Sequence, residues 1–231
     1  MKPSKIKTVA IIPARSGSKG IKNKNIQKIK NKHLIGWAIE TCKLSKEIDF
    51  FFVLTDSSKY KNIAKKYGAS VPFIRPKSIS KDNSTDMEFI KYSIKKLAEL
   101  DINPKIIINI RPTTPFRSHQ VVDKAIKIFL KKIKNYTSLR SVEEMPETAL
   151  KTLFIKKKLA KPIMKNLNME EINLPRQKFP KTYSANGYVD IYKVESVKKN
   201  YLYGNKVFAF ITERTIEIDT KYDLQLAKKI I

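Results

Sequence analysis

The sequence predicts a doubly wound α/β fold, in which a mostly parallel sheet is covered by helices on both faces. Up to about residue 137, short apolar runs alternate with longer amphipathic stretches, as in strands that are joined by crossover helices. The loops that follow these apolar runs are rich in turn-forming and cationic residues. With 231 residues, of which 42% are hydrophobic, the chain is expected to form a single domain, 1–231, around its own core.

The elements of the first half follow from hydrophobic periodicity. The strand 8–12 runs into Pro13, and the helix 57–67 ends at Gly68, a natural stop signal. After the strand 106–110, two prolines exclude both ladder pairing and helix. The predicted strands are 8–12, 50–54, 71–74 and 106–110, and the predicted helices are 34–45, 57–67, 85–99 and 118–134.

The regular alternation breaks after about residue 137. Short strand-like runs occur at 137–142, 150–155, 186–193 and 207–211, and a long polar stretch covers 161–184. We expect the residues from about 140 to 206 to form an inserted arm or flap within the domain. A final extended segment, 216–220, precedes a helix that runs from Lys221 to the terminus.

The formal charge of +27 narrows the class of binding partner. It leaves nucleic acid, an anionic membrane surface or a polyanionic small molecule. Only seven of the 48 basic residues are Arg, and the many Lys residues accompany an Ile and Asn bias typical of an AT-rich coding sequence. Nucleic-acid-binding proteins favour Arg, or basic stripes interleaved with aromatic residues. Most of the positive charge is therefore interpreted as a result of the coding bias and not as a binding surface.

The inventory of reactive residues excludes several chemistries. Two His and one Cys cannot build a His and Cys metal cluster, and a single Cys excludes an internal disulfide. No apolar run approaches the roughly 18 residues that span a bilayer, and the N-terminus has no signal-peptide core. We therefore expect a soluble, cytoplasmic protein without a membrane partner, whose chemistry uses cations, carboxylates and a hard metal.

The strongest local feature is the loop after the first strand, which reads PARSGSKG at 13–20. Open parallel sheets bind ligands at the carboxyl ends of their strands. The two glycines allow tight backbone paths that turn amide N–H groups toward a phosphate, and Arg15, Lys19 and Lys24 add cations. The spacing matches neither the classical P-loop nor the dinucleotide-binding fingerprint. These residues predict a polyphosphate-binding loop, with an ordinary basic turn as the alternative.

A pair of carboxylates suggests a metal site at the same edge of the sheet. In an extended segment, Glu217 and Asp219 lie on one face, about 7 Å apart. Oxygen ligands that act together with substrate phosphates favour magnesium over calcium. The alternative is a surface strand end, with Asp219 as the N-cap of the last helix.

In combination, these features resemble the acylneuraminate cytidylyltransferases, the enzymes that make CMP-activated nonulosonic acids such as CMP-sialic acid. The resemblance extends from Ile11 to the terminal helix, and its best signature is the opening loop together with Lys24-Asn25-Ile26. The other matching segments follow in the family's order. They are 54–57, 75–76, 82–86 and 111–117, then the stretch that begins at 175–177 and passes 183 to end at 186–187, and finally 218–220, which precedes 223–224 in the last helix. The resemblance implies a Rossmann-like nucleotide-diphospho-sugar transferase fold with a small dimerisation arm.

The resemblance also implies roles for individual residues. The implied catalytic residues are Lys19, Arg15 and Asp219. The nucleotide, CTP, is assigned to Arg15, Ser18, Lys19, Lys24, Asn25 and Thr85. The sugar acid is assigned to Arg111, Lys151, Arg176 and Asn186. The implied Mg²⁺ ligands are Asp219 and Glu217. Family members are typically homodimers in which the arm reaches the partner's active site.

Three departures from the family pattern bear on the acceptor and the metal. Arg111 stands where many sialate-activating members have Gln, Asp190 stands where they have Tyr, and Glu217 replaces the first Asp of the metal pair. The implied reaction is attack by the anomeric hydroxyl of a nonulosonic acid on the α-phosphorus of CTP, which releases pyrophosphate. Two alternatives stay open: a sugar nucleotidyltransferase of the same fold with another sugar acid or nucleotide, and a basic nucleic-acid-binding protein. On the favoured reading, nucleic acid is not a partner.

Overall fold

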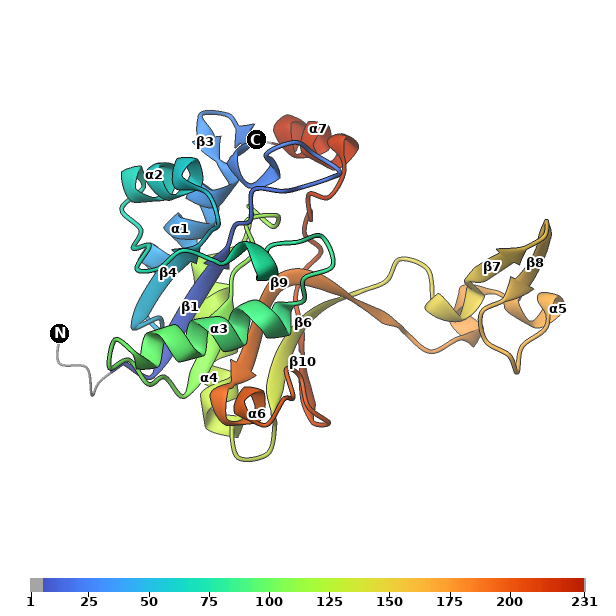
Figure 1. Cartoon of the computed structure of the whole chain (residues 1–231). Coiled ribbons are helices and arrows are strands. Elements are labelled where there is room, and N and C mark those ends of the chain that lie inside the picture. Colours follow the sequence, from blue (N-terminus) through green and yellow to red (C-terminus); the bar gives the residue numbers. More distant parts are fainter. Residues whose placement is uncertain (1–5, 231) are drawn as a thin grey trace.

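A computed structural model describes residues 6–230 and places a six-stranded sheet at the centre of the chain (Figure 1). The strand order is β10-β6-β9-β5-β1-β4. The strands are β1 (Thr8–Pro13), β4 (Phe50–Leu54), β5 (Ile106–Asn109), β6 (Ser138–Glu144), β9 (Tyr183–Lys193) and β10 (Val207–Ile211). β1 runs parallel to β4 and β5, and β10 runs parallel to β6, whereas β9 is antiparallel to both of its neighbours. The predicted mostly parallel sheet is confirmed.

Helices cover both faces of this sheet. One face packs against α1 (Leu34–Leu44), α2 (Ser58–Lys66) and α4 (His119–Lys132), and the other against α3 (Asp86–Ala98) and α6 (Val194–Lys198). Alternate residues of β1 enter the two cores: Ala10 and Ile12 join the first, and Val9 and Ile11 the second. This arrangement confirms the doubly wound fold. Within residues 6–230, no helix combines the length and apolarity that a membrane-spanning segment needs.

One strand prediction is wrong, and another is right only in its second half. Residues 71–74 form no strand, and their neighbourhood contributes only an isolated bridge between Ser70 and Phe52. Pro72, inside the segment, and Pro76, just beyond it, explain this, because a proline has no N–H group to donate to a ladder. The predicted strand 150–155 begins instead with a 3₁₀ turn at Ala149–Lys151, and strand β7 follows at Leu153–Lys156.

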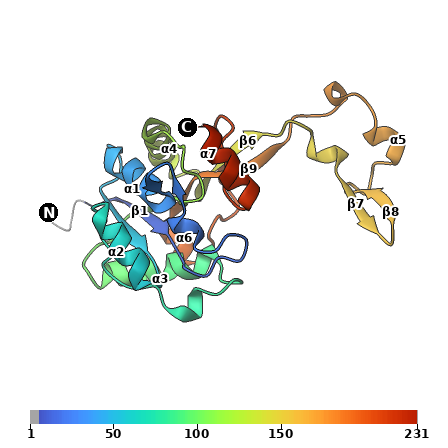
Figure 2. The same ribbon diagram turned by 90° about the horizontal axis from the view of Figure 1, so that it is seen from above.

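An arm projects from the sheet between β6 and β9, over residues 145–182 (Figures 1 and 2). It carries the hairpin of β7 and β8 (Leu159–Pro162) and the short helix α5 (Met169–Ile172). The projecting segment is narrower than the predicted 140–206, because β6, β9 and β10 are strands of the central sheet. Its base is a two-stranded ribbon in which Val142 to Glu144 pair with Tyr183 to Ala185.

The helix α7 (Lys221–Ile230) lies against segments from the first part of the chain, between residues 20 and 34. It packs beside the hairpin of β2 (Lys28–Ile29) and β3 (Lys32–His33), where Leu224 and Ile218 share a small core with Ile29. The approach is close at Gly20, where an added Cβ would lie 2.8 Å from the carbonyl oxygen of Asp219. The missing side chain of this glycine therefore allows the loop after β1 to lie against the segment before α7.

Candidate active site

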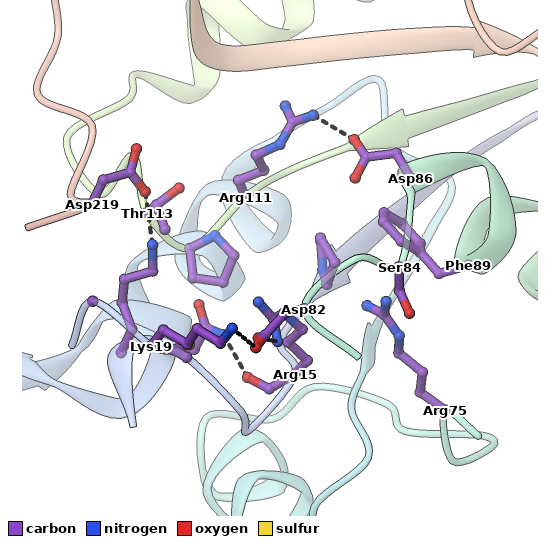
Figure 3. A pocket seen from close by; sticks show the side chains of 16 residues that line it. Arg15, Lys19, Arg75, Asp82, Ser84, Asp86, Phe89, Arg111, Thr113 and Asp219 are labelled. Atoms are coloured by element: carbon purple, nitrogen blue, oxygen red, sulfur yellow. Dashed lines mark hydrogen bonds and ion pairs between the residues drawn. The ribbon is translucent and has the colours of Figure 1, made fainter. Parts of the chain in front are cut away.

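A cavity of about 480 Å³ lies where the loops after β1 and β5 meet the start of α3 and the segment before α7 (Figure 3). Because β1 and β5 are parallel, their carboxyl ends open onto the same edge of the sheet, as the fold class predicts for a ligand site. The lining holds five cationic side chains and three carboxylates, which are Arg15, Lys19, Lys24, Arg75 and Arg111, and Asp82, Asp86 and Asp219.

The loop after β1 is held in place by polar contacts at its base. The Asp56 carboxylate, just beyond β4, accepts hydrogen bonds from the Ser16 amide (2.8 Å) and the Ser16 hydroxyl (3.0 Å). The buried Asn25 donates from Nδ2 to the carbonyl oxygen of Arg15 (3.0 Å). These contacts fix the backbone path, so that the cationic side chains of the loop reach the cavity.

Three cations of this loop converge at the cavity and pair with carboxylates from distant segments. Arg15 donates to Asp82 (2.8 Å), and Lys19 Nζ lies 2.9 Å from the other oxygen of the same carboxylate. Lys24 Nζ lies 2.7 Å from Oδ1 of Asp219. The hydrogen bonds from Lys19 and Arg15 lower the pKa of Asp82, so this carboxylate stays ionised. Since one carboxylate serves two cations, positive charge is left over for an anionic ligand.

The two predicted metal ligands lie next to each other, but only Asp219 lines the cavity. Glu217 is half-buried beside it and accepts a long hydrogen bond from Thr113 Oγ1 (3.5 Å). Gly187, at φ +63°, makes room for Glu217, because a Cβ there would lie 2.8 Å from Glu217 Oε1. Burial raises the pKa of Glu217, and the negative charge of Asp219 raises it further.

This donor set fits a Mg²⁺ ion whose coordination shell is completed by substrate phosphates. Mg²⁺ in nucleotide enzymes is typically held by one or two carboxylates together with substrate phosphates, and a cation here would relieve the repulsion between Glu217 and Asp219. No group of three or more His, Cys, Asp or Glu within residues 6–230 is placed to hold a metal by itself. The substrate phosphates would therefore have to supply the remaining ligands.

Seven of the predicted site residues line the cavity and five do not. The seven are Arg15, Ser18, Lys19, Lys24, Asn25, Arg111 and Asp219, and the five are Thr85, Lys151, Arg176, Asn186 and Glu217. Thr85 instead forms the N-cap of α3 in a capping box with Glu88, because its side chain accepts from the Glu88 amide. Ser84 and Asp86, on either side of it, face the cavity.

The predicted sugar-acid residues of the arm and its base lie outside the cavity of their own chain. Lys151 donates to the carbonyl oxygen of Leu174 (3.1 Å) within the arm. Arg176 pairs with Glu144 (3.2 Å) where the arm leaves the sheet. Asn186 is buried at the base and donates to Thr212 Oγ1 (2.7 Å). Because the arm extends away from the sheet (Figure 1), the structure does not bring its two cations together with the loop after β1.

Arg111, at the end of β5, lies between two carboxylates. Its Nη2 donates to Asp86 Oδ2 (2.6 Å), and its Nη1 donates to Asp190 Oδ2. Asp190 is only 2% exposed, and Arg140 Nε lies 3.8 Å from its other oxygen. Burial alone would lower the pKa of Arg111, but the attraction of Asp190 and Asp86 outweighs burial and raises it. The guanidinium is therefore charged, with both terminal nitrogens engaged.

Several cavity residues had no role assigned from the sequence: Arg75, Asp82, Ser84, Asp86 and Phe89. Four of them fall within the matched segments 75–76 and 82–86, so a signal existed, but only Thr85 was singled out. Arg75 is buried, donates from Nε to the carbonyl oxygen of Ile79 (2.9 Å) and lies 4.9 Å from the Phe89 ring centre. Phe89 carried no signal, because an apolar residue on a helix is typical of core.

Two relatives match along almost the whole of this chain. An N-acylneuraminate cytidylyltransferase of Escherichia coli O18:K1:H7 is 28% identical over 228 residues, which are 96% of this chain and 51% of the relative. A CMP-N,N′-diacetyllegionaminic acid synthase of Legionella pneumophila is 26% identical over 231 residues, 98% of this chain and 97% of the relative. The chain thus spans about half the length of the first relative and nearly all of the second.

Solved structures share the fold. A CMP:2-keto-3-deoxy-manno-octonic acid synthetase complexed with CTP has a TM-score of 0.72 at 14% identity, covering 97% of this chain and 98% of the other. A 4-diphosphocytidyl-2C-methyl-D-erythritol synthase from Anaerococcus prevotii has a TM-score of 0.62 at 13% identity, covering 97% and 95%. These likenesses confirm the predicted doubly wound, Rossmann-like architecture. Residues 9–230 match the cytidylyltransferase family model. The chain therefore belongs to the cytidylyltransferases, a family of nucleotidyltransferases, and its resemblance to the acylneuraminate enzymes is confirmed.

Proposed function

We propose that this chain transfers CMP from CTP to the anomeric hydroxyl of a nonulosonic acid and releases pyrophosphate. The observation that carries the proposal is the convergence of Arg15, Lys19 and Lys24 on one cavity of a cytidylyltransferase. The match with almost the full length of a CMP-N,N′-diacetyllegionaminic acid synthase supports an acceptor of the nonulosonic acid class.

The chemistry of this reaction suits the charges of the cavity. The hydroxyl oxygen bonds to the α-phosphorus, the bond from that phosphorus to the bridging oxygen breaks, and pyrophosphate leaves with the electron pair. The hydroxyl proton passes to solvent. Negative charge grows on the phosphate oxygens in the transition state, and Arg15, Lys19 and Lys24 are held where they can stabilise it.

We propose Mg²⁺ as the cofactor, held by Asp219 and Glu217 together with the phosphates of CTP. When bound, the ion would neutralise phosphate charge and assist the departure of pyrophosphate. Asp219 is 65% exposed, so its carboxylate can meet a second cation while Lys24 remains beside it. Lys24 would then bridge the carboxylate and the phosphate chain.

We also propose that the chain acts as a cytoplasmic homodimer, as expected from the resemblance. The arm carries Lys151 and Arg176 away from the cavity of its own chain and exposes apolar side chains, including Ile155 (76%), Leu159 (63%) and Ile163 (54%). Such patches typically mark interaction surfaces. Light scattering should give a dimer for the unmodified chain and a monomer for Ile155→Asp/Leu159→Asp. The control is Lys157→Asp, in the turn of the same hairpin, which should stay dimeric. A dimer that survives the double change would contradict this role of the arm.

Pyrophosphate release tests the proposed reaction. The purified chain is given CTP with N-acetylneuraminic, N,N′-diacetyllegionaminic or pseudaminic acid, with and without EDTA, and ATP, GTP and UTP replace CTP in parallel. We expect release that requires CTP and one of these acids and that stops with EDTA. Release with another nucleotide alone would favour a different sugar nucleotidyltransferase. No release from any pair, with salt-sensitive binding to duplex DNA, would favour the nucleic-acid-binding alternative.

A further inference from the structure

The cavity has a second end that the phosphate chemistry does not use. Arg111 and Asp86 face each other there, away from Lys19 (Figure 3). The side chain of Asp86 is 34% exposed, and that of Arg111 is 21% exposed. This end therefore presents a carboxylate to the ligand, whereas the opposite end presents the cations of the loop after β1.

Arg111 is not free to receive a carboxylate from the substrate. Both of its terminal nitrogens already donate to carboxylates, one to Asp86 and one to Asp190. Asp190 is 2% exposed, so withdrawing Arg111 would strip a buried charge of its main partner, which is strongly unfavourable. Arg111 thus links Asp190 on β9 to Asp86 at the start of α3 and holds these two elements in a fixed relative position at the cavity.

Asp86 keeps one oxygen available. Its Oδ2 accepts from both Arg111 Nη2 (2.6 Å) and Asn109 Nδ2 (3.3 Å). Within residues 6–230, no side chain or backbone donor contacts Oδ1. Asp86 is also the first residue of α3, where the helix dipole favours a negative charge. The site therefore offers a single carboxylate oxygen, oriented by the contacts of its neighbour, that is available to accept a hydrogen bond.

We infer that Asp86 determines acceptor specificity: its Oδ1 accepts a hydrogen bond from a hydroxyl or amide N–H group of the sugar acid, and Arg111 and Asp190 are the positioning residues that aim it. This inference rests on the proposed function. The exposed part of the Asp86 carboxylate repels the carboxylate of the acid and the phosphates of CTP, while it attracts neutral donors. The acid would then enter with its donor groups toward Asp86 and its carboxylate toward the cations.

The direct test is the Michaelis constant for each substrate, measured by pyrophosphate release with the best acid of the panel. Asp86→Ala should raise KM for the acid roughly 10- to 100-fold, the usual scale for a hydrogen bond to a charged group. Asp86→Asn, which keeps an oxygen acceptor, should lose less. KM for CTP should change by less than about threefold in both. The matched control is Glu99→Gln, at the far end of the same helix, which should leave both constants unchanged.

The positioning role has its own readout. Asp190→Asn removes the charge on β9 that holds Arg111 in place. We therefore expect KM for the acid to rise, while kcat and KM for CTP stay unchanged. Analogues of the acid that each lack one hydroxyl group then identify the donor. The analogue without the donor should have a higher KM than the parent acid for the unmodified enzyme. For Asp86→Ala, the analogue and the parent acid should have the same KM. Thermal unfolding of each variant shows whether the fold is intact.

The outcomes separate the two proposals. If the unmodified enzyme releases no pyrophosphate with any acid, the proposed function and this inference both fall. If it does, and Asp86→Ala folds with an unchanged KM for the acid, the inference alone is overturned. A rise in KM for CTP instead of the acid would assign Asp86 to the nucleotide and would equally overturn it.

Discussion

The ammonium group of Lys24 lies 2.7 Å from Oδ1 of Asp219, although 195 positions separate the two residues. Lys24 is 17% exposed and Asp219 is 65% exposed, so the lysine is enclosed while the carboxylate keeps a face open to solvent. One contact thus joins a cation proposed for the phosphates to a carboxylate proposed for the metal. This geometry makes Asp219 the residue at which the two roles can be separated experimentally.

Asp219→Asn should lower kcat by roughly 100-fold or more, the scale expected when one preorganised charge is lost from a phosphoryl-transfer site. The Mg²⁺ concentration for half-maximal rate should rise as well, because a carboxylate ligand is missing. Initial rates measured over a range of Mg²⁺ concentrations give both quantities. The control is Asp223→Asn, which can still accept from the Thr220 amide at the start of α7. An unchanged Mg²⁺ requirement in Asp219→Asn would remove Asp219 from the metal site.

Lys19→Ala should lower turnover by at least roughly 100-fold without harming the fold. Lys19 is 84% exposed and forms its ion pair with the partly exposed Asp82, so its contribution to stability is small. The free energy of unfolding should stay within about 0.5 kcal/mol of the unmodified chain. Lys22→Ala, in the same loop but outside the cavity lining, should keep normal turnover. Near-normal turnover in Lys19→Ala would contradict its assignment as a catalytic residue.

The buried pair of Arg111 and Asp190 should behave as a coupled unit in unfolding. Arg111→Gln should cost about 3–5 kcal/mol, because it removes the main partner of a buried carboxylate. The double variant Arg111→Gln/Asp190→Asn should be less destabilised than the sum of the two single changes, since no charge is left unpaired between those positions. Urea unfolding gives the free energy of unfolding of all three variants, analysed with one common dependence on urea concentration. Simple additivity would show that the two side chains do not stabilise each other.

Glu217→Gln should make the metal-free protein more stable at pH 8. Burial and the charge of Asp219 raise the pKa of Glu217 above its ordinary value of 4.5, so the folded state favours the protonated form. Below that ordinary value both states are protonated, and the variant should match the unmodified chain. As the pH rises through the folded-state pKa, the unmodified chain ionises at a cost that the variant avoids. Thermal melts from pH 4 to pH 8 should therefore diverge with rising pH.

Adding Mg²⁺ should reverse this difference, because the ion would favour the ionised Glu217 that the variant lacks. The melting temperature of the unmodified chain should then rise more than that of Glu217→Gln when Mg²⁺ and CTP are present. Equal shifts in both proteins would count against Glu217 as a ligand.

The central strands and the helices around them could be predicted because their burial is visible in the sequence. The strands 8–12, 50–54 and 106–110 are continuous apolar runs, and the structure places them side by side as β1, β4 and β5. The prediction failed at 71–74, where the apolar composition indicated a strand although Pro72 lies inside the segment and Pro76 just beyond it. It also misplaced the strands of the arm, because in the exposed hairpin of β7 and β8 no buried face imposes an alternating pattern.

The sequence by itself determined the doubly wound fold, the family and the cations of the loop after β1, because each can be recognised from residue types in short segments, taken singly or in their order along the chain. Only the tertiary structure decided which charges meet. Asp82 reaches Arg15 across 67 positions, Asp219 reaches Lys24 across 195, and Arg111 is held by Asp86 and Asp190. It also turned Thr85 into a helix cap and carried Lys151 and Arg176 away on the arm. Local composition fixes how much charge a segment carries, but the partner of each charge depends on the folded path of the whole chain.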